Sequence, residues 1–112
     1  MHELGITRNI VAIVSDAAGG RRVRRVTLEI GQLSGVMADA VRFCFDIVAQ
    51  GTVVEGATLD IREPAGRASC RRCGAEFAIA TLWAACACGS RDVVRLQGEE
   101  LTVKTMELEE AA

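Results

Sequence analysis

Two pairs of cysteines carry the clearest chemical signal in this chain. Cys70 and Cys73 stand in "SCRRCG", and Cys86 and Cys88 stand in "AACACGS" thirteen residues further on. Two pairs at this separation can bring four thiolates together, which is the ligand set of a tetrahedral zinc site. A glycine follows Cys73 and another follows Cys88, and each permits the tight turn in which backbone N–H groups point at a sulfur. The spacing therefore predicts a structural Zn²⁺ held by these four cysteines.

Other uses of these thiols stay open at the level of sequence. A redox dithiol at Cys70 and Cys73 would normally accompany a βαβ pattern, which this segment lacks. An iron–sulfur site is chemically possible, because four thiolates also suit iron. The fifth cysteine, Cys44, lies in an apolar helical stripe, where we expect it to pack as a small hydrophobe and not to bind metal.

The only histidine of the 112 residues is His2, in "MHEL". A free α-amine, the neighbouring backbone amides and an imidazole within two residues can wrap one metal ion as an all-nitrogen chelate. Nickel(II) and copper(II) both accept such planar sites. With its single histidine here, the chain shows no Ser-His-Asp arrangement, and it has no GxxxxGK[ST] phosphate loop. We therefore expect a metal-binding protein and not an enzyme.

Composition and charge limit the class of protein. Half of the residues are apolar, a quarter are charged, and the net charge is −2, which describes a globular protein and argues against a primary role on nucleic acid or an anionic membrane. No stretch is long enough to span a bilayer, and the first residues lack the basic region of a signal peptide. We expect a cytoplasmic protein, in which reduced cysteines favour metal over disulfides.

The elements that must position these residues follow from hydrophobic periodicity. Apolar residues recur at helical spacing over 4–18 and 37–49, with Ser34 or Asp39 as a candidate cap for the second helix. Alternation predicts strands within 21–31, 51–63 and 99–109, the last with either a bulge or two buried faces. The order predicts an α+β fold in which a small three-stranded sheet with two helices is interrupted by a zinc-ribbon-like insertion. The expected domains are 1–63 plus 96–112, and 64–95.

Several motifs occur in a telling order: "MHE", "LEIGQLSGV", "FCFDIVAQGTVVEGATLDI", C-x-x-C and "GEELTVKTMELE". In this order, over essentially the whole chain, they resemble the HypA/HybF family, accessory proteins that deliver nickel during [NiFe]-hydrogenase maturation. The resemblance implies a cytoplasmic nickel metallochaperone that works with the GTPase HypB and the hydrogenase large subunit. It implies His2 as chief nickel ligand, completed by the Met1 amine and the backbone of His2 and Glu3, with the Glu3 carboxylate as an alternative. At "CAC" the chain departs from the C-x-x-C that is usual in the family.

A different class, a zinc-ribbon module that binds nucleic acid or protein, is the main alternative. It would use the arginines of the cysteine-containing segment, namely Arg67, Arg71, Arg72, Arg91 and Arg95. Stacking aromatic residues usually accompany such arginines, yet the chain has no tyrosine and only four aromatic residues. We read the arginines of "RRVRR" as the solvated start of a strand. We therefore expect no nucleic-acid partner. The expected oligomeric state is a monomer or weak homodimer.

Overall fold

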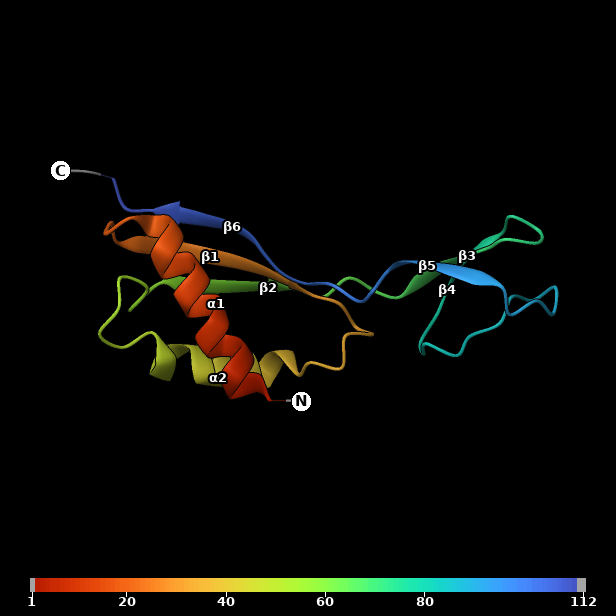
Figure 1. Cartoon of the computed structure of the whole chain (residues 1–112), viewed down its shortest axis with the longest axis horizontal. Coiled ribbons are helices and arrows are strands. Elements are labelled where there is room, and N and C mark those ends of the chain that lie inside the picture. The colour runs from red at the N-terminus through yellow and green to blue at the C-terminus, as the bar shows by residue number, and fades with distance from the viewer. Residues whose placement is uncertain (1, 111–112) are drawn as a thin grey trace.

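The computed structural model describes residues 2–110, which form an elongated molecule of 58 × 27 × 17 Å (Figure 1). These residues contain two helices and six strands: α1 Glu3–Ala18, β1 Val23–Ile30, α2 Ala38–Val48, β2 Thr58–Arg62, β3 Arg67–Cys70, β4 Glu76–Ala78, β5 Val93–Gln97 and β6 Leu101–Leu108. The six strands form two small sheets at opposite ends of the long axis (Figure 1). No helix within residues 2–110 has the length and hydropathy needed to cross a membrane.

The first sheet has the strand order β2-β1-β6, so the three predicted strands and two predicted helices are confirmed. β1 is central, pairing in parallel with β2 and antiparallel with β6. Of the two alternatives for the last strand, the bulge is present: Thr27 pairs with Thr105, whereas Leu28 pairs with Val103, so one residue of β6 is left over between them. The α1 helix packs against α2, β1 and β6.

The core of this part of the molecule lies between β1 and the helices. In β1, Val26, Leu28 and Ile30 are fully buried, as expected for the central strand of a covered sheet. The α1 helix buries Ile10 and Val14, four positions apart on one face. It ends at Gly19, which adopts the left-handed conformation (φ 59°) that favours glycine at a helix C-terminus.

The α2 helix is not capped as the sequence predicted. Its N-cap is Met37, which makes no side-chain cap hydrogen bond, so the prediction of Ser34 or Asp39 is wrong. Asp39 lies two residues beyond the N-cap, inside the helix, and pairs with Arg42 at 3.1 Å. The Ser34 hydroxyl instead accepts a hydrogen bond from the backbone N–H of Val36, ahead of the helix. The backbone N–H of Met37 instead donates to the side chain of Glu3, a residue of α1.

The second sheet, with order β4-β3-β5, is formed by the segment inserted between β2 and β6. Both β4 and β5 pair antiparallel with β3. The β5 strand continues to Gln97, two residues beyond the boundary expected at 95. The division into domains remains a prediction, but this sheet gives the cysteines a separate framework.

The two sheets are joined where the loop after β1 crosses both connecting segments. The backbone N–H of Gln32 donates to the carbonyl of Pro64, and that of Leu33 donates to the carbonyl of Gly98 at 2.7 Å. The crossing leaves no space for a side chain at position 66: a Cβ on Gly66 would lie 2.4 Å from the carbonyl oxygen of Ile79 and 2.7 Å from the Leu33 side chain. Glycine at position 66 is therefore a condition of this junction.

Candidate metal centre and the amino-terminal site

Two tight turns hold the four cysteines. Cys70 ends β3, and the turn that follows is closed by hydrogen bonds from the Cys70 N–H to the Ala75 carbonyl and from the Gly74 N–H to the Cys70 carbonyl, both at 2.9 Å. In the second turn, the Cys86 N–H donates to the Ser90 carbonyl at 2.9 Å. The glycine after each pair has a positive φ (78° and 92°). The C-x-C pair thus keeps a glycine-closed turn despite its shorter spacing.

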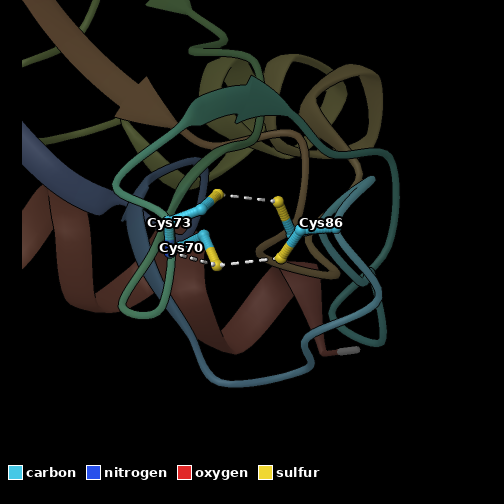
Figure 2. Close-up of side chains that lie close together, drawn as sticks. Cys70, Cys73 and Cys86 are labelled. Carbon is cyan, nitrogen blue, oxygen red and sulfur yellow. Dashed lines mark hydrogen bonds between the residues drawn. The ribbon is translucent and has the colours of Figure 1, made fainter.

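The four sulfurs converge on one point. All four lie within 4.8 Å of one another. The Cys70 sulfur is 3.7 Å from that of Cys88, and the Cys73 sulfur is 3.5 Å from that of Cys86 (Figure 2). A zinc–sulfur bond of about 2.3 Å in a tetrahedron requires sulfur–sulfur separations of about 3.8 Å. The predicted cluster is therefore assembled at the spacing that a tetrahedral metal ion needs.

The electrostatics of the cluster also suit a cation. The backbone N–H of Cys73, 3.5 Å from the Cys70 sulfur, favours the thiolate and lowers the pKa of Cys70 to about 6. The pKa of Cys73 is raised: the Ala75 N–H favours its thiolate, but the adjacent sulfurs of Cys86 and Cys70 oppose it more strongly. Four thiolates this close repel one another, and a divalent cation at their centre would remove that repulsion.

Burial divides the cluster in two. Cys70 and Cys86 are buried, whereas Cys73 and Cys88 are exposed at the surface. Cys44 lies half-buried in α2 and is not part of the cluster; its packing in the core stays a prediction. A redox dithiol would need Cys70 and Cys73 as an isolated pair, yet here the sulfur of each lies beside one from the second pair. The arrangement is that of a metal site, not of a disulfide-forming pair.

The amino-terminal candidates lie elsewhere. Met1 falls outside the described residues. His2 is exposed and is the N-cap residue of α1, but its side chain makes no cap hydrogen bond, so the imidazole is available to a ligand. The structure therefore places the predicted nickel ligand at the start of α1 and the four cysteines in the inserted segment, in different parts of the chain.

The Glu3 side chain has a partner that the sequence did not indicate. Its Oε2 accepts a hydrogen bond from the backbone N–H of Met37 at 3.0 Å, and this bond lowers the pKa of Glu3. Met37 also lines an open cavity of about 290 Å³, together with Val36, Ala38, Asp39 and Glu63. No local pattern links residue 3 to residue 37, so only the tertiary structure could reveal this contact.

The arginines of the "RRVRR" stretch are engaged within the first sheet. Arg24 pairs with Glu107 at 2.9 Å, and Arg25 pairs with Asp60 and Glu107. Arg22 donates to a backbone carbonyl, that of Glu55. Acidic residues of the neighbouring strands thus offset these charges, which weakens the case for a nucleic-acid patch at this end of the molecule.

Comparison with known proteins agrees with this geometry. A family described as hydrogenase/urease nickel incorporation, metallochaperone, hypA matches residues 1–108. The hydrogenase maturation factor HypA of Rippkaea orientalis is 60% identical over 98% of this chain and 97% of that protein, and the one of Trichormus variabilis is 58% identical over the same shares. The solution structure of the Ni metallochaperone HypA from Helicobacter pylori has the same fold, with a TM-score of 0.69 at 24% identity over 96% of this chain and 97% of that one. The chain therefore belongs to the HypA family of nickel metallochaperones that act in hydrogenase maturation.

Proposed function

We propose that this protein carries one nickel(II) ion at its amino terminus and delivers it to the large subunit of a [NiFe]-hydrogenase, in concert with a HypB-type GTPase. The observation that carries the proposal is the exposed His2 imidazole, free of cap hydrogen bonds, at the start of α1. The chain itself catalyses no reaction in this scheme. It works in the cytoplasm as a monomer or weak homodimer, and the nickel ion is its cargo.

The backbone at the start of α1 supplies further nitrogen donors. The first N–H groups of a helix have no intrahelical acceptor, so the Glu3 amide nitrogen can take part in a chelate without breaking the helix. The Glu3 carboxylate already accepts the Met37 N–H, which favours the backbone nitrogen over the carboxylate as the donor from this residue. The proposed ligands are therefore the His2 side chain, the Met1 amine, and the backbone nitrogens of His2 and Glu3.

The second metal in the proposal is a structural Zn²⁺ held by Cys70, Cys73, Cys86 and Cys88. The sulfur–sulfur distances support it, and so does the small core of the inserted sheet. Ala68, Ile79 and two of the four cysteines are the only buried apolar residues that the described part of this segment contains. So small a core needs a metal to hold it. Zinc would then maintain the inserted unit while nickel comes and goes at the other site.

Nickel titration of purified protein tests the proposal. The native protein should bind one nickel ion, and His2→Ala should lose this binding while keeping its zinc content, because His2 is exposed and outside the core. In a hydrogenase-producing strain deprived of the gene, the native protein should restore hydrogenase activity and His2→Ala should not. Undiminished nickel affinity in His2→Ala would refute the amino-terminal site.

A further inference from the structure

The inserted sheet carries a groove that the proposed metal sites do not use. It has a volume of about 170 Å³ and lies between the loop after β4 and the strand β5. Its lining residues are Leu82, Trp83, Ala84, Arg91, Val93 and Arg95. None of them is a candidate metal ligand, so the proposed metal sites do not account for the groove.

An apolar surface and a cationic rim meet in this groove. Trp83, the only tryptophan of the chain, has 85% of its surface exposed, and Leu82 beside it is also exposed. Alternation along β5 puts Val93 and Arg95 on the same face of the strand, next to this loop. A large aromatic residue left in water beside arginines is typical of a protein–protein contact, where tryptophan and arginine supply most of the binding energy.

We propose that this groove docks an acidic segment of a partner protein, with an apolar side chain of that segment against Trp83 and carboxylates on the arginines. Charge complementarity carries the choice of occupant. Arg91 makes no ion pair within residues 2–110, and Arg95 has only an exposed pair with Glu99 at 3.0 Å. An exposed pair of this kind is worth little, so an incoming carboxylate can replace it. A planar guanidinium group can donate two parallel hydrogen bonds to one carboxylate, and this pairing fixes the orientation of the bound segment.

The same residues suit a single-stranded nucleic acid less well. Successive bases need successive aromatic platforms, and Trp83 is the only aromatic residue that lines the groove. An acidic protein segment therefore fits the observations better than a phosphate backbone does.

The fluorescence of Trp83 provides a direct measurement. The full chain, loaded with zinc and free of nickel, is titrated with the capped peptide Glu-Glu-Leu-Glu-Glu, with the peptide Lys-Lys-Leu-Lys-Lys, and with a thymidine dodecamer. We expect a saturable change in Trp83 emission with the acidic peptide only, weakening as salt is added. No saturation at millimolar acidic peptide, or tighter binding of the oligonucleotide, would overturn the proposal.

Charge reversal supplies the matched control. Arg91→Glu should weaken binding of the acidic peptide by about tenfold or more, which corresponds to at least 1.4 kcal/mol. Arg8→Glu makes the same change of net charge on an exposed residue of α1 and should leave the affinity unchanged. With a fluorescent acidic peptide, Trp83→Leu should also bind more weakly. If Arg91→Glu and Arg8→Glu lost the same affinity for the acidic peptide, the effect would come from net charge alone, and docking in the groove would be refuted. Because nickel binding enters none of these measurements, the groove and the nickel site can fail independently.

Discussion

The Glu3 carboxylate accepts a hydrogen bond from the backbone N–H of Met37, with 3.0 Å between oxygen and nitrogen. This bond ties the first turn of α1 to the N-cap of α2, two positions that are 34 residues apart. The residue beside the proposed nickel ligand is thus anchored to the loop that leads back to the junction between the sheets. Glu3 thereby links the start of α1 to the start of α2.

Replacing Glu3 should therefore loosen the start of α2. In Glu3→Ala the Met37 amide loses its acceptor, so its hydrogen exchange should become faster and the thermal midpoint should fall slightly. Glu3→Gln keeps a carbonyl oxygen at the same place and should restore most of the protection. Hydrogen exchange followed by NMR measures both variants. Equal Met37 exchange in Glu3→Ala and the native protein would show that the bond contributes nothing in solution.

An amino-terminal extension should weaken nickel binding although no residue is replaced. A Gly-Ser dipeptide before Met1 keeps every side chain but turns the Met1 nitrogen into an amide and moves the free amine away. On the chelate proposal, calorimetric nickel titration at constant pH should show a strong loss of affinity. A site made only of side chains, such as those of His2 and Glu3, would bind nickel equally well in both forms.

Loss of one zinc ligand should unfold the inserted sheet and spare the first one. Cys73→Ser should lose zinc, because three thiolates hold it less tightly than four, and NMR signals of residues 64–97 should collapse toward random-coil positions. Signals of α1 and β1 should persist, since their core contains none of these cysteines. Cys44→Ser is the matched control and should keep full zinc content. A protein lacking both Cys86 and Cys88 but still fully loaded with zinc would contradict the assignment.

A methyl group at the junction should be costly, whereas the same change on the open face of α1 should not be. Gly66→Ala forces a carbon within 2.4 Å of the Ile79 carbonyl and should destabilise the protein by about 1–3 kcal/mol. The Leu33 amide, bonded to Gly98, should also exchange faster. At Gly5, nothing lies within 4 Å of the added Cβ, so Gly5→Ala should stabilise the helix by about 0.5–1 kcal/mol. Urea unfolding compares the two, and equal effects would mean that the junction is not tightly packed.

Local patterns were sufficient for much of this structure. The periodicity of apolar residues predicted both helices and the three strands of the first sheet, because each depends on neighbours within a few residues. It gave the bulge in β6 only as one of two alternatives. The cysteine spacing predicted the cluster for the same reason. Each pair of cysteines lies in a tight turn with its own glycine, and this turn is visible in the local sequence.

Long-range relationships were beyond the reach of the sequence. The parallel pairing of β1 with β2 and the Glu3–Met37 bond join segments whose local sequences carry no sign of one another. The strands of the second sheet are three to five residues long, too short for alternation to be recognised. The α2 cap was predicted wrongly: the N-cap is Met37, whose own N–H donates to Glu3 of another helix.

The nesting of one sheet within the other has a consequence for how the chain folds. The β6 strand pairs with β1 only after residues 63–100 have intervened, and closing so long a loop costs conformational entropy. Once the cysteine turns are clamped and β3 has paired with β5, the ends of that loop lie side by side, and the Gln97 side chain donates to the Ala65 carbonyl at 2.9 Å. Each halving of the effective loop saves about 0.6 kcal/mol. The cysteines also leave the ribosome before β6 does, so metal capture by the nascent chain would prepare the last strand to complete the first sheet.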